Sequence, residues 1–166
     1  SAYTKYNIVR YGNVLNSRGS IIPLLDDIGK DESKKFFTLT DDRMTRFVMT
    51  LEESCKLIEY ALSDGDNGEI IVPEILSMKV KDLFELFSEK YKKGIEITGL
   101  RAGEKLYESL INGTQHISTY KKNNYYHITP SYKNIIVNDQ QTDLNSNQNL
   151  LDKEKLRKLL LSENLL

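Results

Sequence analysis

Three short segments of the sequence place arginine beside small polar residues where a strand or helix is expected to begin or end. These segments cover residues 10–14, 41–46 and 99–105. Arginine forks and helix N-termini both bind phosphate well, because each offers several N–H groups to one anion. Three such turns in one chain favour a phosphorylated, acidic ligand. The alternative for each segment is a surface network of ion pairs around a turn.

Most other patterns of catalytic or metal-binding residues are absent from the sequence. It contains no glycine-rich dinucleotide turn, no phosphate loop and no nucleophile elbow. Cys55 lies on the apolar side of an expected helix, which favours a buried structural thiol. His116 and His127 have no acidic or cysteine neighbour at ligand spacing. We therefore expect a chain that binds a ligand, with no metal site and no catalytic residue of its own.

Strands alternate with helices along the chain, and this order predicts an α/β fold. We expect strands near residues 7–11, 36–40, 69–73 and 95–98, and helices near 21–28, 51–62, 77–91 and 103–112. Thr50 and Glu53 have the spacing of a capping box at the start of the second helix. Ser77 is expected to cap the third helix, and Asn112 to end the fourth.

The last third of the chain has a different character. Asn, Gln, Lys, Thr and Tyr are frequent in residues 113–150, where short strands are expected at 125–128 and 135–137. A helix with leucines on one side is expected from 152 to about 161. The change in composition suggests an extension added to an α/β core.

Composition excludes several classes of protein. The 23 basic and 24 acidic residues give a net charge of -1, which argues against a polybasic surface for nucleic acid or membranes. A single cysteine excludes an internal disulfide framework. No apolar run approaches the roughly 20 residues that span a bilayer, and no secretion signal is visible. We expect a cytoplasmic protein.

Several motifs together carry a resemblance to a known family. They are RYGNV at 10–14, SRGSIIP at 17–23, TDDRMTRF at 40–47, MTLEE at 49–53, GEIIVP at 68–73, SMK at 77–79 and RAGEKL at 101–106. In order and spacing they resemble the C-terminal half of extended short-chain dehydrogenases, most closely the UDP-N-acetylglucosamine 4,6-dehydratases of capsule and O-antigen synthesis. The tail, with YYHI at 125–128 and NSN at 145–147, is similar to the C-terminal extension of the 5-epimerising (inverting) branch.

This resemblance implies the substrate-binding half of a Rossmann-type fold, without the N-terminal dinucleotide-binding half. Residues 1–112 would form the substrate-binding part, and 113–166 the extension typical of polysaccharide-biosynthesis proteins. The full-length parent would bind NADP, mostly through the missing half, and would form a homo-oligomer. Its catalytic Tyr-x-x-x-Lys pair is absent here, because Tyr3 and Lys5 have the wrong spacing.

The family's site residues are carried over only where the motifs match. Asn13, Thr45 and Arg46 would contact the sugar nucleotide, Arg101 the diphosphate, and Glu104 the ribose or uridine. Tyr11, Gly12 and Val14 would line the nicotinamide end of the cofactor. The chemistry of these side chains is consistent with the roles that the resemblance implies, since arginine forks suit a diphosphate and a carboxylate suits sugar hydroxyls.

The expected function is therefore a part in nucleotide-sugar dehydration. The parent would act on UDP-GlcNAc, with or without epimerisation at C5, and this chain would position the UDP-sugar without turning it over. Two alternatives stay open. The chain could be a non-catalytic sugar-nucleotide-binding or oligomerisation module, or a piece of a UDP-sugar 4-epimerase.

Overall fold

The computed structural model describes residues 4–133 and 143–166, and these form two compact units. The first unit consists of Ser1–Gly12, Met49–Ile75 and Ser109–Asn145, and the second of Asn13–Val48, Leu76–Glu108 and Ser146–Leu166. Both units combine helices with strands, which confirms the α/β class. The expected division between residues 112 and 113 does not coincide with the boundaries of these units, and it stays a prediction about the sequence.

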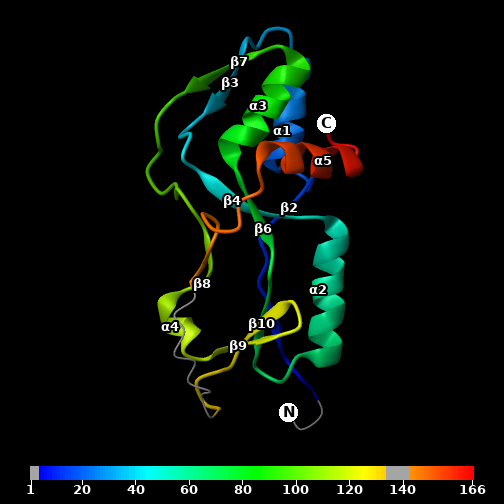
Figure 1. Ribbon diagram of the computed structural model, residues 1–166, viewed down its shortest axis with the longest axis vertical. Coiled ribbons are helices and arrows are strands. Elements are labelled where there is room, and N and C mark those ends of the chain that lie inside the picture. The colour runs from blue at the N-terminus through cyan, green and yellow to red at the C-terminus, as the bar shows by residue number, and fades with distance from the viewer. Residues whose placement is uncertain (1–3, 134–142) are drawn as a thin grey trace. The chain divides into compact units, whose positions relative to one another are not determined.

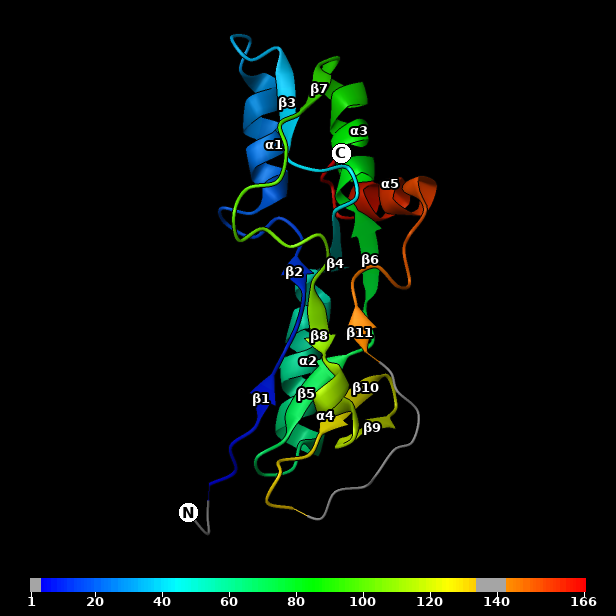
Figure 2. The ribbon, with the colours of Figure 1, turned by 90° about the vertical axis from the view of Figure 1, so that its left-hand side faces the viewer.

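The first unit is built on a four-stranded sheet in the order β1-β5-β10-β9 (Figure 1 and Figure 2). Its elements are β1 (Ile8–Val9), α2 (Leu51–Asp64), β5 (Ile70–Pro73), β8 (Ser109–Ile111), α4 (Gly113–His116), β9 (Thr119–Lys122), β10 (Tyr125–Ile128) and β11 (Leu144–Asn145). β1 runs parallel to β5, whereas β10 runs antiparallel to both of its neighbours. Leu57 and Ala61 of α2 pack on Ile71 of β5 to form the core of this unit.

The predicted capping box starts α2 as expected. The Thr50 hydroxyl accepts a hydrogen bond from the Glu53 amide at 3.1 Å, and the Glu53 carboxylate accepts one from the Thr50 amide at 2.7 Å. The prediction that Cys55 is buried is wrong, because its side chain is exposed. The helix instead buries the face that carries Ser54, Leu57 and Ala61, and the apolar stripe that includes Cys55 faces outward. The stripe consists of Leu51, Cys55, Ile58 and Leu62.

A buried polar cluster joins β10 and β9 to the start of β5. His127 is fully buried, and its Nδ1 lies 2.9 Å from a carboxylate oxygen of Glu69, which is only 3% exposed. The Tyr120 hydroxyl donates to the other carboxylate oxygen at 2.9 Å, and the Tyr60 hydroxyl lies 3.0 Å from His127 Nε2. Burial favours the neutral carboxyl, but the hydrogen bonds from His127, Tyr120 and the Asp66 amide outweigh it and lower the pKa of Glu69.

The second unit contains the helices α1 and α3, which run side by side (Figure 2). Its elements are β2 (Asn13–Val14), α1 (Ile21–Lys30), β3 (Phe36–Leu39), β4 (Thr45–Met49, of which the last residue belongs to the first unit), β6 (Leu76–Lys79), α3 (Val80–Tyr91), β7 (Gly94–Ile97) and α5 (Lys153–Ser162). A three-stranded sheet has the order β2-β4-β6, and β3 pairs in parallel with β7.

The core of the second unit forms where α1, α3 and α5 meet the strands. Phe37, Leu83 and Phe87 are fully buried there, and Leu156 and Leu160 attach the C-terminal helix to the same cluster. The Lys30 ammonium and the Tyr91 hydroxyl both donate hydrogen bonds to Asp26. Together these bonds lower the pKa of the Asp26 carboxyl to about 2. Within residues 4–133 and 143–166, no helix is long and apolar enough to cross a membrane.

Three expectations about element boundaries are wrong. Residues 103–112 form a turn followed by β8 rather than a helix, because the Thr45 amide donates to Leu106 O at 2.8 Å and holds this segment extended. Ser77 lies inside β6, and α3 begins three residues later. Asn112 begins a helix instead of ending one, since its side chain accepts from the amides of Thr114 and Gln115. The strand expected at 135–137 lies outside the described residues.

Acid should weaken the first unit through Glu69. A carboxyl whose pKa is lowered by folding stabilises the fold above its unfolded pKa of about 4.3, and this contribution is lost as the pH falls through the folded pKa. We expect Glu69→Gln to lower the melting temperature at neutral pH and to flatten its decline in acid. Circular dichroism melts across a pH series test this. Glu59→Gln, which changes an exposed carboxyl of α2, is the control, and identical pH profiles for the two variants would contradict the assignment.

Candidate functional site

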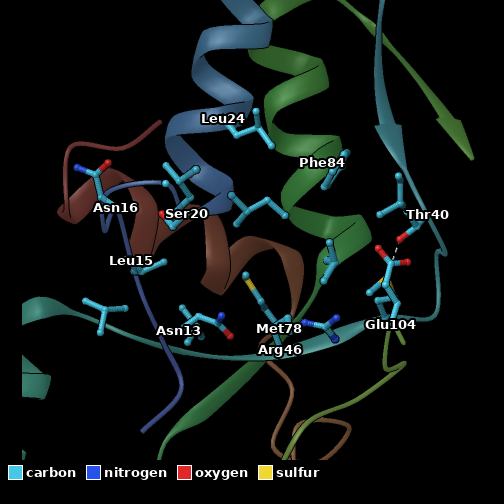
Figure 3. Close-up of a pocket in the computed structure, with 18 of the residues that line it drawn as sticks. Asn13, Leu15, Asn16, Ser20, Leu24, Thr40, Arg46, Met78, Phe84 and Glu104 are labelled. Carbon is cyan, nitrogen blue, oxygen red and sulfur yellow. Dashed lines mark hydrogen bonds between the residues drawn. The ribbon is translucent and has the colours of Figure 1, made fainter. Parts of the chain in front are cut away.

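A cavity of about 480 Å³ lies entirely within the second unit (Figure 3). Much of its wall is apolar and comes from α1, β3, β6 and α3, with Leu24, Leu39, Met78 and Phe84 among the lining side chains. Its polar side chains include Asn13 from β2, Arg46 from β4, and Arg101 and Glu104 from the segment after β7. One wall of the cavity can therefore cover a flat or apolar group, while these side chains can meet charge and hydroxyl groups.

The pleat of β4 decides which of its side chains reach the cavity. Successive residues of a strand point to opposite faces, and Arg46 and Val48 line the cavity whereas Thr45 and Phe47 do not. The Thr45 side chain is buried, and its hydroxyl lies 2.9 Å from the Ser146 hydroxyl. Thr45 therefore supports the strand from the face opposite Arg46.

Arg46 and Asn13 share one carboxylate, that of Glu108. The Arg46 Nε lies 3.4 Å from Glu108 Oε1, and the Arg46 Nη1 donates to Thr45 O at 2.7 Å. With the Asn13 side-chain amide turned so that its nitrogen faces acceptors, that nitrogen donates to Glu108 Oε2 at 3.3 Å and to Phe47 O at 3.1 Å. The two lining side chains are thus oriented by the same acidic residue. Sequence reasoning missed Glu108, because it placed residues 103–112 in a helix.

Arg101 sits in a tight turn closed by Glu104. The Arg101 amide donates to the Glu104 carboxylate at 3.1 Å, and the Glu104 amide donates back to Arg101 O at 3.1 Å. Gly99 and Gly103 flank this turn with φ values of +90° and +88°, a region where side chains bearing a Cβ are strained. Among the described residues, the Arg101 guanidinium has no carboxylate partner, which leaves its charge available to a ligand.

The other two arginines of the segments singled out in the sequence serve the fold. Arg43 makes a two-pronged pair with Asp41 at 2.9 and 2.7 Å, which lowers the pKa of that carboxyl to about 2. Arg10 belongs to the first unit, where it donates to Leu110 O at 2.6 Å and to the Gln115 side chain at 2.8 Å. These two side chains therefore stabilise the fold, and neither lines the cavity.

The cavity brings together five of the eight residues expected from the sequence, namely Asn13, Val14, Arg46, Arg101 and Glu104. Thr45 lies on the opposite face of β4. Tyr11 and Gly12 belong to the first unit, and their expected role at a cofactor stays a prediction. In the described part of the chain, no group of three or more His, Cys, Asp or Glu side chains is arranged to hold a metal ion.

Comparisons with known proteins show which family the chain belongs to. Residues 1–130 match the family described as polysaccharide biosynthesis protein. The chain is 38% identical over 144 residues to a Campylobacter jejuni UDP-N-acetylglucosamine 4,6-dehydratase (inverting), an alignment that covers 87% of this chain and 41% of that protein. It is also 39% identical over 129 residues to a Rickettsia bellii UDP-glucose 4-epimerase, covering 75% of this chain and 37% of that one.

A solved structure, that of Pen from Bacillus thuringiensis, superposes with a TM-score of 0.86 at 31% identity. The superposition covers 98% of this chain and 51% of Pen, and it supports the expectation of a partial Rossmann-type fold. The chain spans less than half the length of the two curated relatives above. The likeness to 4,6-dehydratases expected from the motifs is confirmed, and the chain belongs to the polysaccharide biosynthesis protein family.

Proposed function

We propose that this chain is the substrate-binding part of a nucleotide-sugar dehydratase and that its cavity holds a UDP-sugar, UDP-GlcNAc foremost. The observation that carries the proposal is the convergence of Asn13, Arg46, Arg101 and Glu104 on one cavity. Relatives that are 38% identical carry the name of an enzyme acting on that substrate. The cavity volume of about 480 Å³ falls within the roughly 300–1,000 Å³ common for ligand sites.

The chemistry of the lining matches the parts of such a ligand. A diphosphate carries two or more negative charges, and the guanidinium groups of Arg46 and Arg101 can each offer paired N–H donors to it. Hydroxyl groups of a ribose or a sugar can donate to the Glu104 carboxylate and bond with the Asn13 amide. The apolar wall around Met78 and Phe84 can cover the face of a base.

A UDP-sugar 4-epimerase is the second candidate. It is favoured by the 39% identity to the Rickettsia bellii protein, which is close to the identity with the dehydratase. Where a 4-epimerase alignment extends over 95% of the chain, its identity falls to 33%, below the 38% that the dehydratase shows over 87%, and for this reason we place dehydration first. Both activities take a UDP-sugar, so the proposed ligand of the cavity is the same.

The residues of this chain do not by themselves fit NADP. Val14 lines the cavity, but the sequence has no glycine-rich turn for the pyrophosphate and no Tyr-x-x-x-Lys pair. We therefore assign the cofactor and the hydride chemistry to a part of the parent protein outside this chain. The contribution of this chain is to bind the substrate and fix its orientation, which lowers the entropic cost of the reaction.

The first unit offers a surface on which that part could pack. β1 lies at the edge of its sheet, with the Ile8 side chain 59% exposed. The outward stripe of α2, which runs along the same unit, consists of Leu51, Cys55, Ile58 and Leu62. Exposed apolar stripes of this kind mark interaction surfaces. We propose that the remainder of a protein of the relatives' length covers β1 and this stripe.

Cys55 reports on this packing, because it is the single cysteine of the chain and is exposed. We expect its thiol to react rapidly with a maleimide in the 166-residue chain, and at least about tenfold more slowly in a chain extended upstream, since buried thiols are inert. Peptide mass spectrometry measures the labelling of Cys55 itself. Equal rates in the two proteins would show that the stripe stays uncovered.

UDP binding tests the cavity directly. We expect isothermal titration to detect UDP binding, and Arg101→Ala to weaken it by at least about tenfold, because a hydrogen-bonded charge is lost. Arg43→Ala is the matched control, since Arg43 is paired with Asp41 and does not line the cavity. If the two variants bind UDP equally well, Arg101 is not part of the site.

The chain alone should not convert its substrate. With UDP-GlcNAc and NADP supplied, we expect no product by NMR or chromatography after long incubation, because the Tyr-x-x-x-Lys pair is missing from the sequence. A chain extended upstream is the positive control. Turnover by the 166-residue chain would overturn the division of labour proposed above.

A further inference from the structure

Ser146 belongs to the last segment of the second unit, far along the chain from the strand it contacts. Its side chain is fully buried. The Ser146 Oγ accepts from the Glu108 amide at 2.9 Å, donates to Thr45 O at 3.0 Å, and lies 2.9 Å from Thr45 Oγ1. A hydroxyl has one hydrogen to donate and two lone pairs, so these contacts use its full capacity when Thr45 Oγ1 is the donor.

Both residues that Ser146 touches also touch Arg46. The Arg46 Nη1 donates at 2.7 Å to Thr45 O, the carbonyl that also accepts from Ser146. The Arg46 Nε faces the carboxylate of Glu108, whose backbone amide is bonded to Ser146. Ser146 thus bonds directly to one of the two groups that orient the guanidinium, Thr45 O, and to the backbone amide of Glu108, which carries the other.

The backbone of the tail adds to this hold. The Ser146 amide donates to Glu108 O at 2.8 Å, so the two residues are joined through both backbone and side chain. Three residues further on, Asn149 O accepts from the Ser77 amide, and the Leu151 amide donates to Ser77 O. Residues 146–151 are therefore fixed to β6 as well as to Glu108, and a shift of this segment would disturb both sets of hydrogen bonds.

We propose that Ser146 is a positioning residue of the cavity, which holds Arg46 and Glu108 in the orientation that presents the guanidinium to an anionic ligand. Ser146 does not itself line the cavity and would make no contact with the ligand. The identity of the ligand rests on the function proposed above, whereas the effect on Arg46 can be measured without any ligand. The tail thereby acts on the site through a buried hydroxyl group.

The first arm of the test uses the ligand-free chain. In a ¹⁵N-labelled protein, the Nε–Hε signal of Arg46 is assigned by its absence from Arg46→Lys. We expect Ser146→Ala to shift or broaden this signal, while the signal of Arg157, held by Glu89 and Glu154 elsewhere in the unit, stays in place. An unchanged Arg46 signal in folded Ser146→Ala would overturn the proposal.

Two further variants separate positioning from general stability. Thr45→Val removes one bond to Ser146 but keeps Thr45 O and the Glu108 amide bonded, so it should destabilise the unit and leave the Arg46 signal in place. Ser162→Ala makes the same chemical change at an exposed position of α5 and should alter neither the stability nor the Arg46 signal. If Thr45→Val moves the Arg46 signal as far as Ser146→Ala does, the role is merely structural. Should Ser146→Ala fail to fold, Ser146→Cys, of nearly equal size, replaces it.

The second arm measures UDP affinity by titration. We expect Ser146→Ala to weaken UDP binding about three- to tenfold, as the loss of one oriented hydrogen-bonding group does. In an Arg46→Gln background the same change should have no further effect, because the two residues act through one path. Equal losses in both backgrounds would overturn the proposal. Absence of UDP binding in the unchanged chain would refute the proposed function alone, and the Arg46 signal would still decide the role of Ser146.

Discussion

The alternation of side chains along β4 is the constraint on which the candidate site depends. Because neighbouring residues of a strand face opposite ways, the strand can present Arg46 to the cavity only if Thr45 and Phe47 are buried on the other face. Phe47 meets this requirement as part of an apolar interior. Thr45 is polar, and its hydroxyl needs a buried partner, which Ser146 supplies. The burial of Thr45 thus joins the tail to β4, the strand that carries Arg46.

Some features could be predicted from the sequence because they depend on local chemistry. The capping box of Thr50 and Glu53 needs only two residues three positions apart, and the structure shows it where the sequence predicts it. β10 occupies the four residues expected, since aromatic and β-branched residues favour strands at this spacing. The convergence of Asn13, Arg46 and Arg101 on one cavity was expected from the residue types and the family resemblance, although Asn13 and Arg46 lie within β2 and β4 rather than beyond strand ends.

Other features depend on contacts between distant residues, and these the sequence could not supply. Residues 103–112 have acceptable helix propensity, yet Leu106 O accepts from Thr45 and the segment is extended. Cys55 lies on an apolar stripe, but the sheet packs against the other face of α2. Nothing near Ser146 in the sequence indicates Thr45 or Glu108 as its partners. A tertiary hydrogen bond thus overrode helix propensity in residues 103–112, and packing against the sheet overrode periodicity in α2.

The cationic groups of the three segments differ in what they can offer an anion. Arg43 is tied to Asp41 in a two-pronged pair, so binding a ligand there would require breaking that pair. Arg46 is only partly engaged, at 3.4 Å from Glu108, with 19% of its side chain exposed. Its Nη1 also donates to Thr45 O at 2.7 Å, so these two contacts set the direction of the guanidinium. Arg101 keeps its charge free of any carboxylate in the described chain. A diphosphate would therefore gain most from Arg101, and Arg46, already turned by Glu108, would fix where the second phosphate sits.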